Sequence, residues 1–542
     1  MKQYYVDVRQ VGNNLLIRQM DESRPVNRKV KYQPTLYVPS ESGTFQTLQG
    51  DRLSAKKFDS IYEAKNYIKK YEDVYNFKIF GNTQFGYDWI MENHPETIDF
   101  DYTKLTILSI DIETASEEGF PNINTANEEI LLITVRNFHT KETVTIGSRP
   151  YSGKYQELMK DSSKYTYIQA NDEKHLLELF IEGWRSEYPH VVTGWNSKFF
   201  DIPYLVRRIM RLFGEDAMKE LSPWGIVEPK EIEINGSVET TYDIYGVNHI
   251  DYLDAYKKYG FTDKAPENYK LDTIGEAELG MKKLKNPYET FKEFYTKDWD
   301  LFVVYNAVDV EIVDGLEEVK KLIFLMVSLA YTARVNIADT FSPVRMWEST
   351  IRNYMFPQKT ILPMNGSRLA NTIEGAYVKE VNPSFHEWVV SFDAASLYPS
   401  IICQYNMSPE TLSTTLLPGV SVDGMLNEEY DLSFLREQNL CIVANGHTFT
   451  KEKRGLFPEI VDVTLKSRKV AKNKMLEAEK KYEETGDEQY KIIASVNEAL
   501  SQSLKILANS LYGALSNQYF FLLDYRIAEA ITLTGQYIIK TT

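Results

Sequence analysis

The pattern of apolar and polar positions predicts several folded regions along the chain. Short alternating runs predict strands in residues 1–100, together with one charged helix near residues 62–73. Apolar runs rich in β-branched residues predict buried strands at 104–114 and 389–392. The longest apolar run, residues 322–333, contains Ser328 and Thr332 and is too short to cross a bilayer, so it predicts a buried helix.

Composition and charge narrow the class of protein. A chain of 542 residues is too long for one hydrophobic core, so several domains are expected. Its two cysteines do not support a disulfide framework and fit a reducing compartment. The first residues alternate like a strand and lack the apolar core of a signal peptide. A net charge of −16 excludes a globally basic nucleic-acid binder and leaves only local basic patches for such contacts.

Two acids end the first predicted strand. Asp111 and Glu113 are two positions apart, and the period of a strand places them on the same face. Adjacent like charges repel each other unless a cation lies between them, so the pair predicts a metal site. Two strand-end acids that face solvent are the alternative, and the dipeptide pattern alone does not separate the two.

Two further motifs follow in order. Asn196 precedes Asp201 by five positions, and Pro203 suits the first turn of a helix that begins there. Residues 301–311 have helical periodicity, and the i, i+4 spacing of Tyr305 and Asp309 places both on one helix face. The ordered set Asp-x-Glu, Asn-x4-Asp and Tyr-x3-Asp resembles the proofreading 3′–5′ exonucleases of the DEDD type.

That resemblance implies roles for five residues. Two Mg²⁺ ions, with Mn²⁺ as an alternative, would support phosphodiester hydrolysis, since hard cations prefer carboxylate oxygens. Tyr305 would orient the attacking water. Apart from the resemblance, Phe120 lies in a Gly-Phe-Pro loop close to the first motif, and its ring either stacks on the terminal base or packs in the core. The residues implied to hold the metals are Asp111, Glu113, Asp201 and Asp309.

The second predicted strand leads into the string Asp393-x-x-Ser-Leu-Tyr-Pro-Ser-Ile. We expect the strand to deliver Asp393 and then to break into a turn around Tyr398-Pro399. A lone Asp-x-x-Ser would favour a helix cap, but the full string resembles motif A of the family B DNA polymerases. The resemblance implies that Asp393 and the Ala394 carbonyl bind metal. It also implies that Tyr398 excludes a 2′-hydroxyl, and that the residues lining the nucleotide are Ser396, Leu397 and Tyr398.

A basic segment precedes a second polymerase-like motif. Residues 451–474 hold eight Lys or Arg against three acids, and Arg468 and Lys472 stand at i, i+4 on a helix predicted from Pro458 into the 480s. A solvated helix face is the alternative reading of such a charge run. A returning helix carries Lys-x3-Asn-Ser-x-Tyr-Gly, which resembles motif B and implies two antiparallel fingers helices. The residues implied to contact the nucleotide are Arg468, Lys472, Lys505, Asn509 and Tyr512.

Residues 231–242 alternate around Asn-Gly and predict a β-hairpin. Similar polymerases use such a hairpin to separate the primer end from its template, whereas a plain surface hairpin is the alternative. The strings at 213–223 and 252–258 resemble the T-even-type bacteriophage polymerases specifically.

One expected carboxylate is missing. Polymerisation by two metals needs a second strand-borne Asp, normally in a Tyr-Gly-Asp-Thr-Asp-Ser hairpin, yet residues 516–542 contain only Asp524 and Glu529. The resemblance also leaves the thumb and the clamp-binding peptide without a counterpart. We therefore expect either the N-terminal subunit of a split polymerase or a truncated product. A stand-alone 3′–5′ exonuclease and a non-catalytic DNA-binding scaffold are the alternatives.

The expected fold class is multidomain α/β and α+β, with an RNase H-like exonuclease domain, a partial palm and a two-helix fingers hairpin. The expected partners are primer–template DNA, single-stranded 3′ ends, deoxynucleoside triphosphates and a second polymerase polypeptide, with a sliding clamp bound only through that polypeptide. The expected location is the cytoplasm of an infected host cell. The expected boundaries are an N-terminal domain at 1–100, the exonuclease at 101–322, a return segment at 323–365, the palm at 366–454, the fingers at 455–515 and a further palm segment at 516–542.

Overall fold

The computed structural model describes residues 3–22, 24–74, 77–117, 119–234, 236–260, 266–364, 372–380, 383–390 and 392–542. The chain divides into two compact units, and each is considered by itself. The first comprises Met1–Val11, Leu15–Val30 and Asp99–Val327. The second comprises Gly12–Asn14, Lys31–Ile98 and Ser328–Thr542. The mixture of helical and sheet layers in both units confirms the predicted fold class.

A six-stranded mixed sheet forms the centre of the first unit, in the order β10-β9-β8-β7-β11-β14. Strands β7, β8 and β9 are antiparallel neighbours, whereas β11 runs parallel to both β7 and β14. Strand β7 therefore lies inside the sheet with a partner on each edge. The strands are β7 (Ile107–Thr114), β8 (Ile130–Asn137), β9 (Thr143–Gly147), β10 (Tyr165–Gln169), β11 (Val191–Gly194) and β14 (Asn248–Asp251).

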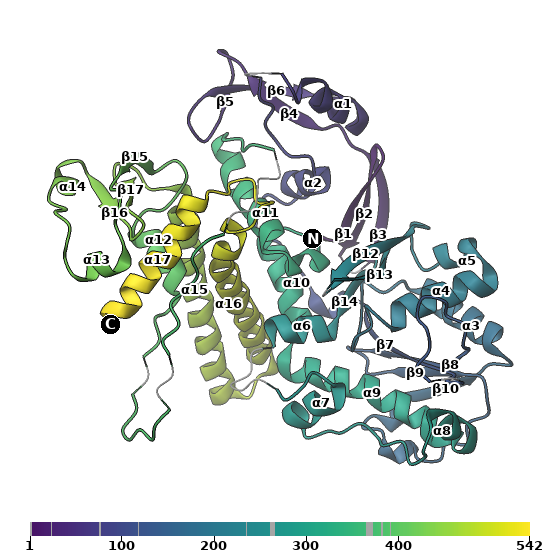
Figure 1. Cartoon of the computed structure of the whole chain (residues 1–542). Coiled ribbons are helices and arrows are strands. Elements are labelled where there is room, and N and C mark those ends of the chain that lie inside the picture. The colour runs from purple at the N-terminus through teal and green to yellow at the C-terminus, as the bar shows by residue number, and fades with distance from the viewer. Residues whose placement is uncertain are drawn as a thin grey trace. The chain divides into compact units, whose positions relative to one another are not determined.

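Helices cover both faces of this sheet (Figure 1). Helices α3 (Glu173–Ser186) and α4 (Asp201–Phe213) pack on one face, where Ile110 and Ile112 of β7 join their apolar residues in a buried core. Helices α8 (Phe291–Lys297) and α9 (Trp299–Lys320) pack on the other face. Because alternate side chains of a strand point to opposite faces, Asp111 and Glu113, which alternate with these isoleucines, face α9.

The remaining strands of the first unit form two smaller sheets. Strands β1 (Gln3–Val11), β2 (Asn14–Asp21) and β3 (Arg24–Lys31) form a three-stranded sheet. Strands β12 (Val227–Ile234) and β13 (Ser237–Ile244) pair in an antiparallel manner, which confirms the predicted hairpin. Its Asn235 lies outside the described residues. The other helices are α5 (Glu215–Lys219), α6 (Tyr252–Tyr259) and α7 (Leu271–Leu279), and α10 (Leu322–Ala333) is the predicted buried helix, within which the sequence passes from the first unit to the second.

Two long helices dominate the C-terminal part of the second unit, and they lie side by side (Figure 1). Helix α15 (Leu456–Thr485) ends at Gly486, whose φ of 66° is the left-handed conformation that glycine adopts at helix ends. Asp487 then caps α16 (Glu488–Leu515) by accepting a hydrogen bond from the Gln489 N–H. These local signals confirm the predicted pair of helices. A series of turns then leads into helix α17 (Tyr525–Thr541).

The other elements of the second unit are short. They are β4 (Thr35–Pro39), β5 (Phe45–Gln46), β6 (Arg52–Lys57), α1 (Ile61–Tyr71), α2 (Phe85–Asn93), α11 (Pro343–Met355), α12 (Leu397–Gln404), β15 (Leu412–Leu416), α13 (Val422–Leu426), α14 (Phe434–Glu437), β16 (Leu440–Ile442) and β17 (His447–Thr450). In the part of the chain that the structure describes, none of the helices has both the length and the apolar content needed to cross a membrane.

The prediction of a buried strand at 389–392 is wrong for the residues that can be described. Val389, Val390 and Phe392 are not in a strand and are 75%, 72% and 90% exposed, and Ser391 lies outside the described residues. An apolar run is buried as a strand only when neighbouring strands hydrogen-bond to it, and no described strand pairs with this segment. The predicted turn around Tyr398-Pro399 is also wrong, because both residues lie in the first turn of α12, where a proline is tolerated.

Candidate active site

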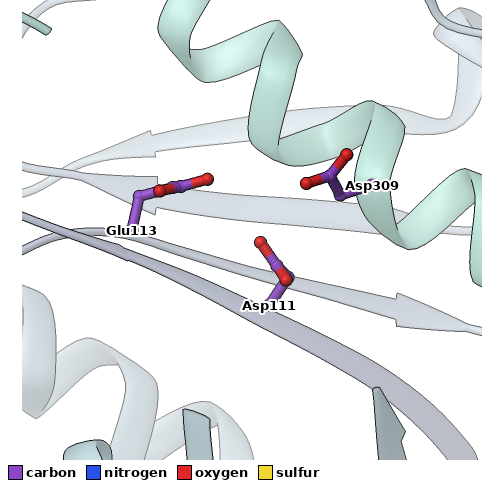
Figure 2. A group of neighbouring side chains, drawn as sticks. All are labelled: Asp111, Glu113 and Asp309. Atoms are coloured by element: carbon purple, nitrogen blue, oxygen red, sulfur yellow. The ribbon is translucent and has the colours of Figure 1, made fainter. Parts of the chain in front are cut away.

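Three acidic side chains converge where β7 faces α9 (Figure 2). Asp111 and Glu113 come from alternate positions of β7, and Asp309 comes from α9. One carboxylate oxygen of each residue lies within 4.8 Å of one oxygen of each of the other two. The alternation of the strand thus places both β7 acids beside the helix, in agreement with the predicted shared face.

Asp201 reaches the same strand from a different helix. It is the first residue of α4 and is only 3% exposed. Its Oδ1 accepts a hydrogen bond of 2.9 Å from the backbone N–H of Ile112, the residue between the two β7 acids. The fourth predicted acid is therefore held beside the strand by the backbone, although it is not one of the three that converge within 4.8 Å.

Tyr305 lies one turn before Asp309 on α9. Its ring packs edge-on against Phe294, with 5.6 Å between the ring centroids. Lys283 Nζ lies 5.0 Å from the centroid of the Tyr305 ring. Burial raises the pKa of the Tyr305 phenol, and the negative charge of Glu113 raises it further. The side chain therefore keeps its hydroxyl proton near neutral pH and can donate a hydrogen bond.

Phe120 is 80% exposed, and its ring centroid lies 5.3 Å from that of Phe200. The core-packing alternative for Phe120 is therefore wrong. An exposed ring held by a second ring can stack on a nucleobase, and this role stays a prediction.

Burial changes the protonation of the acids. It raises the pKa of Glu113 to about 8, of Asp201 to about 7 and of Asp309 to about 6. It also raises the pKa of Asp111 well above its usual range, and the neighbouring carboxylates add to this effect. Buried like charges oppose ionisation, whereas a cation between them would favour it.

The donor set fits a hard divalent cation. All the converging ligand atoms are carboxylate oxygens, which Mg²⁺ and Mn²⁺ prefer. Asp309 Oδ1 is buried and, within the described part of the chain, has no hydrogen-bond partner. Such an oxygen is costly to bury unless a ligand completes its coordination. Asp111, Glu113 and Asp309 are thus the residues that could hold a metal.

Sequence reasoning missed two side chains at this site. Lys283 Nζ lies 2.5 Å from Asp309 Oδ2, and Asn306 Nδ2 donates a hydrogen bond of 2.5 Å to Asp111 Oδ2. Lys283 follows α7 in a loop with no periodic pattern, so nothing in the sequence marked it. The sequence did contain a signal for Asn306, because a polar amide among the apolar residues of a predicted buried helix needs a hydrogen-bond partner.

The residues of the polymerase-like string are only partly brought together. Asp393 and Ala394 are exposed, and Ser396 is the left-handed residue that precedes α12, with a φ of 51°. Tyr398 on α12 lies against Tyr512 on α16, with 4.9 Å between the ring centroids. The first and second polymerase-like motifs therefore meet at these two tyrosines.

The predicted basic and polar contacts lie on the two long helices. Arg468 is partly buried on α15, and Lys472 is exposed one turn later. Lys505 and Asn509 are exposed on α16. Their helical spacing agrees with the sequence, and their contact with a nucleotide stays a prediction.

The two acids that follow α16 have structural roles. Asp524 caps α17 and forms an ion pair with Arg526 at 2.6 Å. Glu529 accepts a hydrogen bond of 3.2 Å from Asn445 Nδ2. Neither is in the strand hairpin that a second polymerase carboxylate requires.

The fold and the acid cluster define an α/β protein with a candidate divalent-cation site. Comparison with known proteins identifies the family. Residues 62–274 match the exonuclease domain of DNA polymerase family B, and residues 348–542 match DNA polymerase family B itself. This chain belongs to DNA polymerase family B.

Individual relatives agree with this assignment. Over 99% of its length the chain is 30% identical to a DNA-directed DNA polymerase of Escherichia phage RB69 and 28% identical to one of Enterobacteria phage T4. Over 84% of its length it is 26% identical to DNA polymerase 1 of Sulfurisphaera ohwakuensis. The chain spans 65% and 66% of the two phage relatives and 49% of the archaeal one.

Proposed function

We propose that the first unit of this chain is a 3′–5′ proofreading exonuclease within a DNA-directed DNA polymerase of a phage type. The observation that carries the proposal is the convergence of Asp111, Glu113 and Asp309 within 4.8 Å in a member of DNA polymerase family B. The substrates would be single-stranded 3′ ends and the frayed end of a primer–template, in the cytoplasm of an infected host cell.

The residues of the site suit hydrolysis of a phosphodiester. Two divalent cations, Mg²⁺ or Mn²⁺, would neutralise charge on the scissile phosphate and lower the pKa of a water molecule. Asp111, Glu113 and Asp309 would hold them, and Asp201 would complete the acidic set. Tyr305, which keeps its proton, would orient the attacking water, while Phe120 would stack on the terminal base.

For polymerisation we propose two-metal nucleotidyl transfer with Asp393 and the Ala394 carbonyl as one half of the metal site. Tyr398 and Tyr512, whose rings meet, would form the floor under the sugar and base of the incoming deoxynucleotide, alongside Ser396 and Leu397. The side chains that would contact the triphosphate and the nascent pair are Arg468, Lys472, Lys505 and Asn509.

We further propose that a second polypeptide supplies the remaining palm carboxylate and the thumb, and that a sliding clamp binds through it. Two observations support this proposal. Asp524 and Glu529 are engaged in capping and side-chain contacts, and the apolar side chains of Val389, Val390 and Phe392 are exposed. A truncated product is the alternative. Addition of a polypeptide that carries a Tyr-Gly-Asp-Thr-Asp-Ser hairpin should restore primer extension, which the purified chain should lack. Primer extension by the purified chain would refute the need for a partner.

The exonuclease is tested with the double variant Asp111→Ala, Glu113→Ala. Digestion of a 5′-labelled single-stranded DNA with Mg²⁺ should be abolished, because two of the three converging ligands are lost. The matched control is Glu178→Ala, Glu182→Ala, which removes two exposed acids from α3 in the same unit. Unchanged digestion by the first variant would refute the site assignment.

A further inference from the structure

Asn306 connects the candidate metal site to the interior of the sheet. Its side chain lies on α9, is completely buried and touches two strands of the sheet. Asn306 Nδ2 donates to Asp111 Oδ2 at 2.5 Å, and Asn306 Oδ1 accepts from the hydroxyl of Thr134 on β8. An amide buried among the apolar residues of a helix is unfavourable unless both of its ends are satisfied, and here both are.

The hydrogen bonds continue into the next strand. Thr134 Oγ1 lies 2.7 Å from Thr145 Oγ1 on β9, and both threonines are completely buried. The register of the sheet aligns the series, because Asp111 pairs with Thr134 across β7 and β8, and Thr134 pairs with Thr145 across β8 and β9. Three neighbouring strands and one helix therefore share one line of polar side chains.

The line has a defined direction. When a cation is bound, Asp111 would be ionised and could only accept hydrogen bonds, so the amide nitrogen of Asn306 faces Asp111 and its oxygen faces Thr134. Thr134 then donates to that oxygen, and Thr145 donates to Thr134. Every member thus supports the orientation of the next, and the series ends on Asp111 Oδ2.

We propose that Asn306, supported by Thr134, is a positioning residue that holds Asp111 in the orientation needed for metal binding. The inference rests on the exonuclease proposed above. With Oδ2 hydrogen-bonded to the amide, the other oxygen of Asp111 would be available to hold a cation together with Glu113 and Asp309. Groups that hydrogen-bond a metal-ligating carboxylate fix its orientation, and their loss typically weakens metal binding about 10- to 100-fold.

The first experiment measures Mn²⁺ binding to the full chain by electron paramagnetic resonance. The binding that Asp111→Ala loses defines the site. Asn306→Ala should raise the Kd of that site about tenfold or more, and it should lower digestion of single-stranded DNA at limiting Mn²⁺ much more than at saturating Mn²⁺. A purely structural role for Asn306 would reduce activity equally at both concentrations.

The second experiment uses Thr134, whose replacement by valine exchanges the hydroxyl for a methyl group of similar size. Thr134→Val deletes the hydroxyl and should weaken Mn²⁺ binding in the same direction, whereas Thr134→Ser keeps the hydroxyl and should bind Mn²⁺ as the unaltered chain does. Thr193→Val is the matched control, because Thr193 is a completely buried strand residue whose hydroxyl has no hydrogen-bond partner within the described residues. If Asn306→Ala fails to fold, the positioning role is tested by Mn²⁺ binding to Thr134→Val and Thr134→Ser: weaker binding by the valine variant supports it, and equal binding overturns it.

Two outcomes separate this inference from the proposed function. If Asp111→Ala binds Mn²⁺ as the unaltered chain does, the exonuclease metal site itself is refuted. If Asp111→Ala loses Mn²⁺ but Asn306→Ala and Thr134→Val bind it normally, only the positioning role is overturned.

Discussion

Lys283 Nζ lies 2.5 Å from Asp309 Oδ2, so a lysine stands directly beside the candidate metal site. Burial alone would lower the pKa of Lys283, but the charges around it, chiefly that of Asp309, outweigh burial and raise it. The lysine is therefore a cation at neutral pH. In the absence of metal it neutralises part of the charge of the acids.

We predict that Lys283→Met destabilises the metal-free chain by about 2 kcal/mol. Breaking a fully buried pair costs roughly 3–5 kcal/mol, and 28% exposure of the lysine side chain reduces that cost. Urea denaturation in EDTA measures the effect, and added Mn²⁺ should narrow the difference, because the metal takes over the neutralising charge. The control is Lys297→Met, which breaks an exposed Lys297–Glu293 pair of the same 2.5 Å length. Equal effects of the two substitutions would contradict the prediction.

Arg136 of β8 forms a buried ion pair with α9, five residues after Asp309. This guanidinium is 1% exposed, and its Nη2 lies 2.8 Å from Asp314 Oδ2. Its Nη1 also donates at 2.8 Å to Thr143 Oγ1. Because Asp314 and Asp309 are on the same helix, the ion pair fixes the helix that carries Asp309 against strands β8 and β9.

Arg136→Met should therefore lower both stability and nuclease activity. The substitution removes a buried guanidinium from Asp314, which keeps its ion pair with Lys141 at 2.7 Å, and we expect a cost of about 3 kcal/mol. The exposed pair between Arg185 and Glu220, with an Nη1–Oε2 distance of 2.6 Å, provides the control, and Arg185→Met should cost under about 1 kcal/mol. Denaturation midpoints and single-stranded DNA digestion are measured for both. If the Arg136→Met variant is as stable as the control variant, the pair does not hold the helix.

The acidic residues of the site were predictable because they depend on local periods. A period of two placed Asp111 and Glu113 together, and the i, i+4 spacing placed Tyr305 beside Asp309. Both patterns need only the geometry of one strand or one helix. The residues that surround these acids could not be predicted in this way.

Long-range contacts account for what the sequence missed. Asn306 bonds to Thr134, which lies on a strand far away in the sequence, and Lys283 reaches Asp309 from a loop. The prediction of a buried strand at 389–392 was wrong for a related reason. Composition favours a strand there, but burial depends on which other strands are available to pair with it. Elements with strong local signals were thus predicted well, and contacts between elements were not.

Two glycines of the second unit make a comparative prediction. A Cβ at Gly513 of α16 would meet no atom within 4 Å, whereas a Cβ at Gly535 of α17 would lie 3.1 Å from Tyr398 Cε1. Alanine in place of glycine stabilises a helix by up to about 1 kcal/mol. Gly513→Ala should therefore raise the urea midpoint. Gly535→Ala should raise it less or lower it, since the Tyr398 ring must move against Tyr512. A larger gain at Gly535 would contradict the tight contact.

The last prediction concerns acid. Burial, together with the charge of Arg18, lowers the pKa of the His190 imidazole to about 3. His190 Nδ1 accepts a hydrogen bond of 2.8 Å from the Thr106 N–H, and its buried Nε2 has no partner among the described residues. The folded chain therefore keeps this imidazole neutral, whereas the unfolded chain protonates it near pH 6.5. The unfolded state binds more protons between these values, so this contribution to stability is complete above pH 6.5 and falls as the pH decreases toward 3.

Through His190, the free energy of unfolding should be about 2 kcal/mol lower at pH 5 than at pH 7.5. His190→Asn keeps an acceptor for the Thr106 N–H and removes the titration. We expect the variant to be less stable than the unaltered chain at pH 7.5, because the ring packing is lost, but to lose less stability between pH 7.5 and pH 5. Urea midpoints at the two pH values measure the difference. His175→Asn controls for the hydrogen bond, since His175 Nδ1 accepts the Asn171 N–H at 3.0 Å on a partly exposed helix. Identical pH dependence for His190→Asn and the unaltered chain would show that another group governs the acid sensitivity of this unit.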